Sequence, residues 1–231
     1  MNQVPAHHPI RRDFERVSPD LVARARIYQA AILADVAGRR GTLHGRIQPL
    51  ATTMRVAGPA FTVEVRPGDN LMIHAALAMA RPGDVIVVDG KGDLSCALTG
   101  ALMSAQAAAA GLGGFVIDAA VRDREECAAR EFPIFAAGCN PNGPTRSLAG
   151  QIGWPISIAG TAVEPGDLIV GDADGVVVIP RSQAARIVAA AQAKVDLELA
   201  RVAAIRQGNL VSAWLPMSLR ALGLLGADEA L

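Results

Sequence analysis

Residues 113–126 read G-G-F-V-I-D-A-A-V-R-D-R-E-E, and this stretch indicates both the fold and the position of a site. Residues 115–117 form an apolar run after two glycines, which is typical of a fully buried strand. Ionisable residues are concentrated beyond the run: Asp118, Arg122, Asp123, Arg124, Glu125 and Glu126. The buried strand predicts an α/β fold. Open α/β sheets bind ligands beyond the carboxyl ends of their strands, so we predict a site at these charged residues.

The adjacent pair Arg122 and Asp123 admits two interpretations. A guanidinium offers a planar set of donors and a carboxylate is a hard oxygen ligand. The pair would therefore suit a carboxylate or enolate substrate held against a divalent cation. Alternatively, Asp123 caps a helix that begins after it, and Arg122 pairs with an acid. The pattern alone leaves both interpretations open.

Composition excludes several classes of protein. The 231 residues are 51% apolar but only 3% aromatic, which fits one large domain with a core of Ala, Val, Ile and Leu. Lysine plus arginine equals aspartate plus glutamate at 22 each, so we expect no nucleic-acid partner. Three cysteines without a C-x-x-C pair argue against a disulfide framework and a cysteine zinc site. The chain has neither a membrane-length apolar run nor a signal-peptide pattern, so we expect no membrane association and a cytoplasmic location.

Three segments are expected along the chain. Residues 1–17 are polar and contain two prolines, as in an arm lying on the surface or on a neighbour. Residues 18–208 form a single domain, and residues 209–231 form an apolar extension with Trp214 that we expect to dock on a subunit. The predicted helices cover residues 18 to between 38 and 41, 70–80, 94–110, 125–130 and 180–207. The predicted strands cover residues 60–66, 85–88, 115–117, 132–135, 154–159, 168–170 and 175–179.

Local signals support several of these elements. Ser18 followed by Pro19 predicts a capped helix start, and alternation over residues 60–66 predicts a half-buried strand. The helix at 94–110 begins near Ser95 or, because Gly100 lies inside it, at Ala101. The glycine-rich loop at residues 89–93 lacks the spacing of a phosphate-binding loop, so we reject that interpretation.

Five stretches together resemble one family: P-G-D-N-L-M-I-H (67–74), P-G-D-V-I-V-V-D-G (82–90), G-F-V-I-D-A-A-V-R-D (114–123), F-P-I-F (132–135) and E-P-G-D-L-I-V-G-D-A-D-G-V-V-V-I-P (164–180). In this order they resemble the RraA-like family. It contains the class II 4-hydroxy-4-methyl-2-oxoglutarate / 4-carboxy-4-hydroxy-2-oxoadipate aldolases and the regulator of ribonuclease activity A. The resemblance implies a β/β/α layered fold of the swivelling-domain type with N- and C-terminal helices. It also implies homotrimers or homohexamers with active sites between subunits.

The resemblance implies roles for individual residues. Asp123 would bind a divalent cation, Mg²⁺ or Mn²⁺, and Arg122 would contact the oxygens of a 2-keto acid substrate. After Gly100, the backbone amides near Leu102 and Met103 would hold the substrate carboxylate. In addition, Glu198 of a neighbouring subunit would hold metal-bound water.

One position departs from the aldolase pattern. Ala101 lies where the aldolases carry Asp or Glu, twenty-one residues before Arg122. Glu126 matches the acid expected three residues after Asp123. Asp93, on the glycine-rich loop, is a candidate to replace the missing carboxylate.

Two functions follow from these features. The first is a metal-dependent lyase that cleaves 4-hydroxy-2-keto diacids to pyruvate and that could also decarboxylate oxaloacetate; Asp123 and Glu126 favour it. The second is a non-catalytic regulator that binds a protein, which Ala101 favours. No lysine is suitably placed for a Schiff base, because Lys91 is on the loop and Lys194 on the last helix. His44 and His74 are interpreted as capped or packed histidines.

Overall fold

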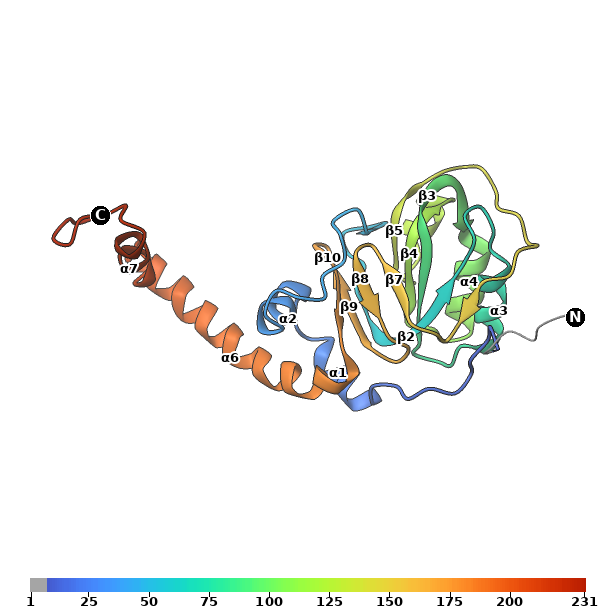
Figure 1. Ribbon diagram of the computed structural model, residues 1–231, viewed down its shortest axis with the longest axis horizontal. Helices are drawn as coiled ribbons and strands as arrows, with labels where there is room; N and C mark the ends of the chain where they lie inside the picture. Colours follow the sequence, from blue (N-terminus) through green and yellow to red (C-terminus); the bar gives the residue numbers. More distant parts are fainter. Residues whose placement is uncertain (1–7) are drawn as a thin grey trace, which may run out of the picture. The chain divides into compact units, whose positions relative to one another are not determined.

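The structure is a computed structural model that describes residues 8–231 (Figure 1). The chain forms one compact unit up to Ala191, and Gln192–Leu231 form a second. The first seven residues of the predicted arm lie outside the described residues. Beyond them the arm follows the first unit, where Arg11 N donates to Ile152 O at 2.9 Å and Val17 N to Gly166 O at 3.1 Å.

A mixed sheet forms the centre of the first unit. Its strand order is β1-β5-β4-β3-β2-β9-β10, and β6 pairs with β2. The parallel strands are β2 (Val56–Glu64), β3 (Val85–Thr99), β4 (Gly114–Val121) and β5 (Ile134–Cys139). The antiparallel strands are β1 (Gln48–Pro49), β6 (Gln151–Ile152), β9 (Leu168–Asp172) and β10 (Gly175–Ile179).

Helices and a small second sheet cover the central sheet. The crossover helices α3 (Leu71–Met79), α4 (Ala101–Ala109) and α5 (Arg124–Ala128) link the parallel strands. Figure 1 shows α3 and α4 on one side of the sheet and the hairpin β7 (Ile156–Ile158) and β8 (Thr161–Val163) on the other. The predicted α/β fold with β/β/α layers is therefore confirmed.

The central strands are more deeply buried than the sequence pattern indicated. The predicted half-buried strand at 60–66 is β2, which begins at Val56 and is buried at every position up to Val63. The half-buried interpretation was wrong because β2 has a neighbour on each edge, β3 and β9, and is packed on both faces. Thr62, which alternation placed on a polar face, is fully buried and donates its hydroxyl to Trp154 O at 2.7 Å.

The first predicted helix is two helices, α1 (Pro19–Ala25) and α2 (Ala30–Val36). The predicted start is confirmed, since the Ser18 side chain accepts a hydrogen bond from Leu21 N and Pro19 is the first helical residue. The prediction of a single continuous helix was wrong. The chain starts a second helix at Ala30, whose N–H donates to the Asp172 carboxylate at 2.8 Å. That partner lies at the end of β9, far away in the sequence.

The stretch at residues 94–99 is a strand rather than the first turns of a helix. Of the two predicted starts for the following helix, Ser95 was wrong and Ala101 is correct. Strand β3 continues through the glycine-rich loop because its distal half pairs irregularly with β4, with Asp93 opposite Ala119 and Thr99 opposite Val121. Long-range pairing overrides the helical composition here.

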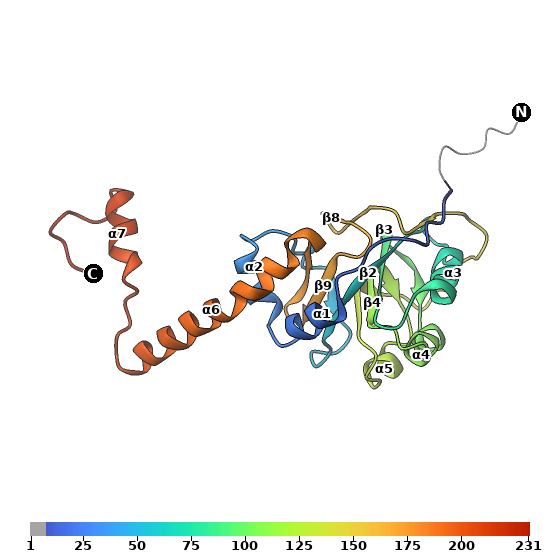
Figure 2. The ribbon, with the colours of Figure 1, turned by 90° about the horizontal axis from the view of Figure 1, so that it is seen from below.

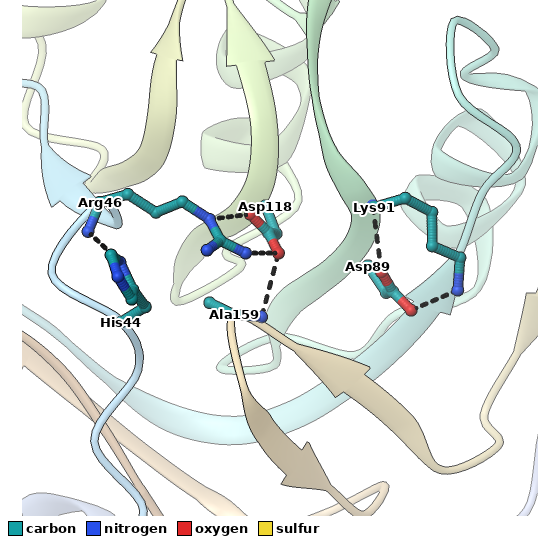
Figure 3. A network of polar contacts seen from close by, with 6 residues as sticks. All are labelled: His44, Arg46, Asp89, Lys91, Asp118 and Ala159. Carbon is teal, nitrogen blue, oxygen red and sulfur yellow. Dashed lines mark hydrogen bonds and ion pairs between the residues drawn. The ribbon is translucent and has the colours of Figure 1, made fainter.

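Strand β4 is longer than predicted and extends to Val121, so Asp118 lies inside it and not at its end. The Asp118 carboxylate is 3% exposed and accepts two hydrogen bonds from Arg46, at 2.9 and 2.8 Å, and one from Ala159 N at 3.0 Å (Figure 3). The hydrogen bond from Arg46 to Asp118 raises the pKa of Arg46. Asp118 therefore joins the sheet to the segments before β1 and after β7.

The chain ends in helices. Helix α6 (Arg181–Arg206) agrees with the prediction for 180–207 to within one residue at each end. The extension contains a helix that was not predicted, α7 (Trp214–Ala221; Figure 2), and none of its residues is buried. Within residues 8–231, no helix is both long enough and apolar enough to cross a membrane.

Candidate functional site

A pocket of about 130 Å³ lies where β3 and β4 end and where α3 and α4 begin. Five of the six predicted site residues line it: Gly100, Leu102, Met103, Arg122 and Asp123. The other lining residues are Asn70, His74, Ala97, Leu98, Thr99, Pro144 and Arg146. The expected position at the carboxyl edge of parallel strands is thus the position of this pocket.

Asp123 and Arg122 occupy the turn between β4 and α5. Asp123 has a left-handed backbone conformation (φ 57°), which Asp adopts more readily than most residues. Arg122 N donates to Thr99 O at 3.0 Å, which joins this turn to the end of β3. The Nε of Arg122 lies 3.7 Å from the Asp123 carboxylate, so the cation and the anion lie side by side at the pocket.

Asp123 caps a helix, but not the one that follows it. It precedes α5 without capping it through its side chain. Its Oδ2 instead accepts a hydrogen bond from Ala101 N, the first residue of α4, at 2.9 Å. A carboxylate beside a helix N-terminus is stabilised by the partial positive charge there. Asp123 can therefore cap a helix and still bind a cation, because its other carboxylate oxygen, Oδ1, is not used by the cap.

Gly100 makes the close approach of this turn possible. Its backbone is extended, so the requirement for glycine is steric and not conformational. A Cβ on residue 100 would collide with Asp123 Oδ2 and lie 2.9 Å from Arg122 Cγ. Any larger residue would displace the two side chains that are proposed to bind substrate and metal.

Three buried polar side-chain atoms without a hydrogen-bond partner in the described part of the chain all belong to residues that line this pocket. They are Asn70 Oδ1, His74 Nε2 and Thr99 Oγ1. The amide of Asn70 is oriented by its own donor, since Nδ2 donates to Leu98 O at 2.8 Å, and its oxygen is left as a free acceptor. Buried polar atoms in native proteins are normally paired, so three such atoms in one pocket indicate a ligand that completes them.

The loop before β6 brings a second arginine, Arg146, to the pocket. Asp69, 1% exposed, anchors this loop: its Oδ2 accepts hydrogen bonds from the Thr145 hydroxyl, Ser147 N and Leu148 N at 2.7, 2.7 and 3.1 Å. Burial alone would raise the pKa of Asp69, but hydrogen bonds from Ser147 N, Leu71 N, Thr145 and Leu148 N outweigh it and lower this pKa. Asp69 therefore stays ionised and fixes the backbone on both sides of Arg146.

The charges around the pocket favour an anion. Arg122 and Arg146 contribute two cations against the single carboxylate of Asp123. Burial, and after it the charge of Arg146, lowers the pKa of His74, so this imidazole is neutral at pH 7. The first-turn amides of α4, which include those of Leu102 and Met103, have no acceptor within the helix. Together these groups can bind a small carboxylate.

The pocket lining offers a divalent cation one carboxylate, that of Asp123. Among residues 8–231, no group of three or more His, Cys, Asp or Glu side chains could hold a metal ion. Mg²⁺, however, keeps several waters and is often bound through only one or two carboxylates. Asp123 supplies one carboxylate at the pocket, with one oxygen fixed by Ala101 N, so it would be the residue that holds the ion.

The remaining candidate residues lie outside the pocket lining. Ala101 is 5% exposed and packs in the hydrophobic core. Asp93 forms a local turn in which its carboxylate accepts from Ser95 N and the Ser95 hydroxyl, at 2.9 and 3.0 Å. Glu126 pairs with Arg130 at 2.6 Å, and Glu198 pairs with Lys194 at 3.0 Å within α6.

Sequence reasoning missed Asn70, His74, Thr99 and Arg146. Two of these were present in the stretch P-G-D-N-L-M-I-H, in which Asn70 and His74 are four residues apart. This spacing puts them on one face of a helix, and the structure has Asn70 at the N-cap of α3 and His74 one turn later. His44, by contrast, accepts a hydrogen bond from Arg46 N at 3.1 Å (Figure 3) and does not line the pocket.

Comparison with known proteins now identifies the family. Residues 24–178 match the RraA-like family, which is described as Aldolase/RraA. The chain belongs to the RraA-like family. The resemblance that the five sequence stretches indicated is therefore confirmed.

Relatives of this RraA-like chain carry the name of one enzyme. A protein of Halalkalibacterium halodurans named "Putative 4-hydroxy-4-methyl-2-oxoglutarate aldolase" is 40% identical over 186 residues, which cover 80% of this chain and 89% of that protein. A Burkholderia mallei protein of the same name is 37% identical over 142 residues, or 62% of this chain and 86% of the relative. These names support an enzyme of the aldolase kind.

Two solved structures have a similar fold. A Pseudomonas syringae protein superposes with a TM-score of 0.77 at 28% identity, covering 85% of this RraA-like chain and 92% of that one. A Streptomyces coelicolor protein is described as an unusual member of the RNase ES inhibitor RraA protein family. It superposes with a TM-score of 0.74 at 28% identity, covering 82% of this chain and 99% of that one.

Proposed function

We propose that this RraA-like protein is a divalent-metal-dependent lyase that cleaves 4-hydroxy-2-keto diacids to pyruvate by a retro-aldol reaction. The observation that carries the proposal is the pocket itself. Arg122, Asp123 and the first turn of α4 meet there, together with three buried polar atoms that have no hydrogen-bond partner in the described part of the chain. The aldolase names of the relatives support the same reaction class.

Two anionic groups of such a substrate would find complementary partners. The carboxylate next to the keto group suits the amides of Leu102 and Met103 at the start of α4, where backbone donors and the helix dipole favour an anion. The second carboxylate suits Arg146, the other arginine of the pocket. Recognition at both ends would orient the bond to be broken next to Arg122.

Cleavage of the C3–C4 bond leaves its electron pair on the pyruvate fragment as an enolate. Arg122 would stabilise the negative charge that develops on the keto oxygen, because a charge-assisted donor in a confined pocket strengthens as that charge grows. A divalent cation held by Asp123 would supply further Lewis-acid stabilisation when bound. Arg122 Nε and the Asp123 carboxylate lie 3.7 Å apart, so both groups would face the same substrate.

A non-catalytic regulator that binds a protein is the second candidate. The likeness to the Streptomyces coelicolor protein favours it, and so does Ala101, which lacks the acid of the aldolase pattern. The unpartnered polar atoms favour the lyase instead. They lie inside a small pocket, where a small ligand could pair with them but the surface of a partner protein could not reach them.

Pyruvate release tests the proposal directly. The purified protein would be assayed on a panel of 4-hydroxy-2-keto diacids and on oxaloacetate, with Mg²⁺, with Mn²⁺ and with EDTA. We expect pyruvate from at least one diacid, activity with either ion and loss of activity in EDTA. Release that is insensitive to EDTA would contradict the metal assignment. No release from any substrate, with folding verified by circular dichroism, would favour the regulator.

A further inference from the structure

We propose that His74 is the acid–base residue of the reaction in this chain, taking the proton of the substrate's 4-hydroxyl on Nε2 and returning it to the enolate carbon. The inference rests on the proposed lyase function. It adds a catalytic residue that the sequence had assigned to packing.

The position of His74 fits this role. It lies one turn into α3, where its backbone N donates to Asn70 O at 3.2 Å. Its side chain lines the pocket together with Arg122 and Asp123. The Nε2 atom is buried and has no hydrogen-bond partner among residues 8–231, so a ligand hydroxyl would complete it.

The other ionisable groups of the pocket are less suited to accept a proton. The guanidinium groups of Arg122 and Arg146 carry only hydrogen-bond donors and no acceptor. One oxygen of Asp123 is engaged by Ala101 N, and its carboxylate is the proposed site for the cation. Among the described residues that line the pocket, His74 is the one whose free form is a base of suitable strength near neutral pH.

Ala101 leaves this pocket without the second carboxylate of the aldolase pattern. The aldolase pattern has an acid at this position, whereas here a methyl group packs in the core. The neighbouring carboxylates do not replace it, because Asp93 is engaged by Ser95 and neither Asp93 nor Glu126 lines the pocket. Burial and the charge of Arg146 lower the pKa of His74, and this keeps its imidazole in the neutral, proton-accepting form.

One proton is moved twice and none is gained or lost. Nε2 removes the proton of the 4-hydroxyl, a carbonyl forms at C4, and the C3–C4 bond breaks. The electron pair of that bond becomes the enolate of pyruvate. The His74 imidazolium then donates the same proton to C3, which yields pyruvate and restores the neutral imidazole. No oxidant, reductant or co-reactant is required.

Exchange of the pyruvate methyl protons with D₂O isolates the step assigned to His74. The exchange would be followed by NMR in the full-length protein with Mg²⁺, alongside retro-aldol kcat and the Kd of pyruvate by calorimetry. For His74→Ala we expect exchange and kcat to fall about 10²–10⁴-fold, the usual contribution of a general acid–base group. The Kd of pyruvate should change less than threefold, and added imidazole should restore part of the exchange. His74→Gln, which keeps a polar side chain, should be as slow as His74→Ala.

The control is His44→Ala, which removes an exposed imidazole that lies outside the pocket. It should exchange at the wild-type rate. An exchange rate of His74→Ala within tenfold of the wild-type rate would overturn the inference. It would also be overturned if His74→Ala lost pyruvate affinity by the same factor as the exchange rate, because His74 would then act in binding. If His74→Ala does not fold, His74→Gln decides by the same criteria. Wild-type protein that neither exchanges nor cleaves would overturn the proposed function as well, so the two failures are distinguishable.

Discussion

The carboxylate of Asp123 accepts a hydrogen bond from the backbone N–H of Ala101 at 2.9 Å. The residue proposed to bind the metal therefore also caps α4, the helix whose first turn is proposed to bind the substrate carboxylate. This contact connects β4 to the start of α4, and it involves the one position at which the chain departs from the aldolase pattern. Under the proposed function, a single carboxylate would couple metal binding, substrate binding and helix capping.

Asp123→Asn separates the two roles of this residue. An amide oxygen can still accept from Ala101 N, and Asn tolerates the left-handed backbone at this position, so the free energy of unfolding should change by less than about 1 kcal/mol. The lost charge should abolish Mg²⁺-dependent pyruvate release. Asp123→Ala, the matched variant, should lose both the activity and the cap. Wild-type activity in Asp123→Asn with Mg²⁺ would refute the metal assignment.

Gly100→Ala should inactivate the protein without unfolding it. The added Cβ would collide with Asp123 Oδ2 and crowd Arg122 Cγ, and both atoms belong to side chains that can move aside. We expect kcat/KM to fall by about 10²-fold, as is typical when reacting groups shift by an ångström. Melting temperature and steady-state kinetics would be measured together. The prediction fails if kcat/KM is retained.

Ala101→Asp tests the vacated position. The aldolase pattern predicts that it restores a carboxylate near the metal, but Ala101 is 5% exposed and packs in the core, and Asp123 would be a like charge nearby. Although an acid at the first turn favours the helix dipole by about 0.3–1 kcal/mol, burying a charge costs more. We therefore expect a lower Tm without metal and a Tm that Mg²⁺ raises more than in wild type, because an ion that binds only the folded state stabilises it.

Differential scanning calorimetry of Ala101→Asp with and without Mg²⁺ measures both the loss of Tm without metal and the rise in Tm that Mg²⁺ produces. Equal Mg²⁺ responses of variant and wild type would show that residue 101 does not face the metal. Pyruvate release by the same samples would report whether the added carboxylate also raises turnover.

Asp69→Asn should loosen the loop that carries Arg146. An amide nitrogen cannot accept the hydrogen bonds from Thr145, Ser147 and Leu148, so donors are left unpaired. We expect a loss of about 1–3 kcal/mol in urea unfolding and a higher KM with little change in kcat. A variant whose KM matches wild type would show that Arg146 does not bind substrate.

The same carboxylate predicts a pH dependence. Because its folded-state pKa is lowered, Asp69 contributes stability that is fully present above its unfolded pKa of about 3.9 and is lost as pH falls through the folded value. Urea unfolding of wild type and Asp69→Asn should therefore converge as the pH is lowered below about 4.

The protein should be a homo-oligomer, a trimer or hexamer in which Glu198 acts from a neighbouring subunit. Large apolar side chains of the C-terminal extension are exposed, including Trp214 at 64% and Met217 at 72%. Light scattering at micromolar concentration should give a multiple of 23.9 kDa. A stable monomer would contradict the prediction and, with it, the role given to Glu198.

The sequence by itself determined the strands, turns and helix caps whose signals are local. Ser18 and Pro19 started a helix as predicted, and the run at 115–117 was a buried strand. The sequence also showed that Arg122 and Asp123 are adjacent and that a glycine precedes α4. Charge pairing between neighbours can be predicted from such local features. Arg122 and Asp123 could therefore be named from the residues themselves, whereas Gly100, Leu102 and Met103 were named through the family resemblance.

Only the tertiary structure decided features whose partners are distant in sequence. The break between α1 and α2 depends on Asp172, and the strand at 94–99 depends on pairing with β4, so local propensity misassigned both. Asn70, His74 and Arg146 come from two separate segments and meet only at the pocket. No local pattern distinguishes a packed histidine from one whose Nε2 is buried without a partner, because that property exists only once the surrounding elements have assembled.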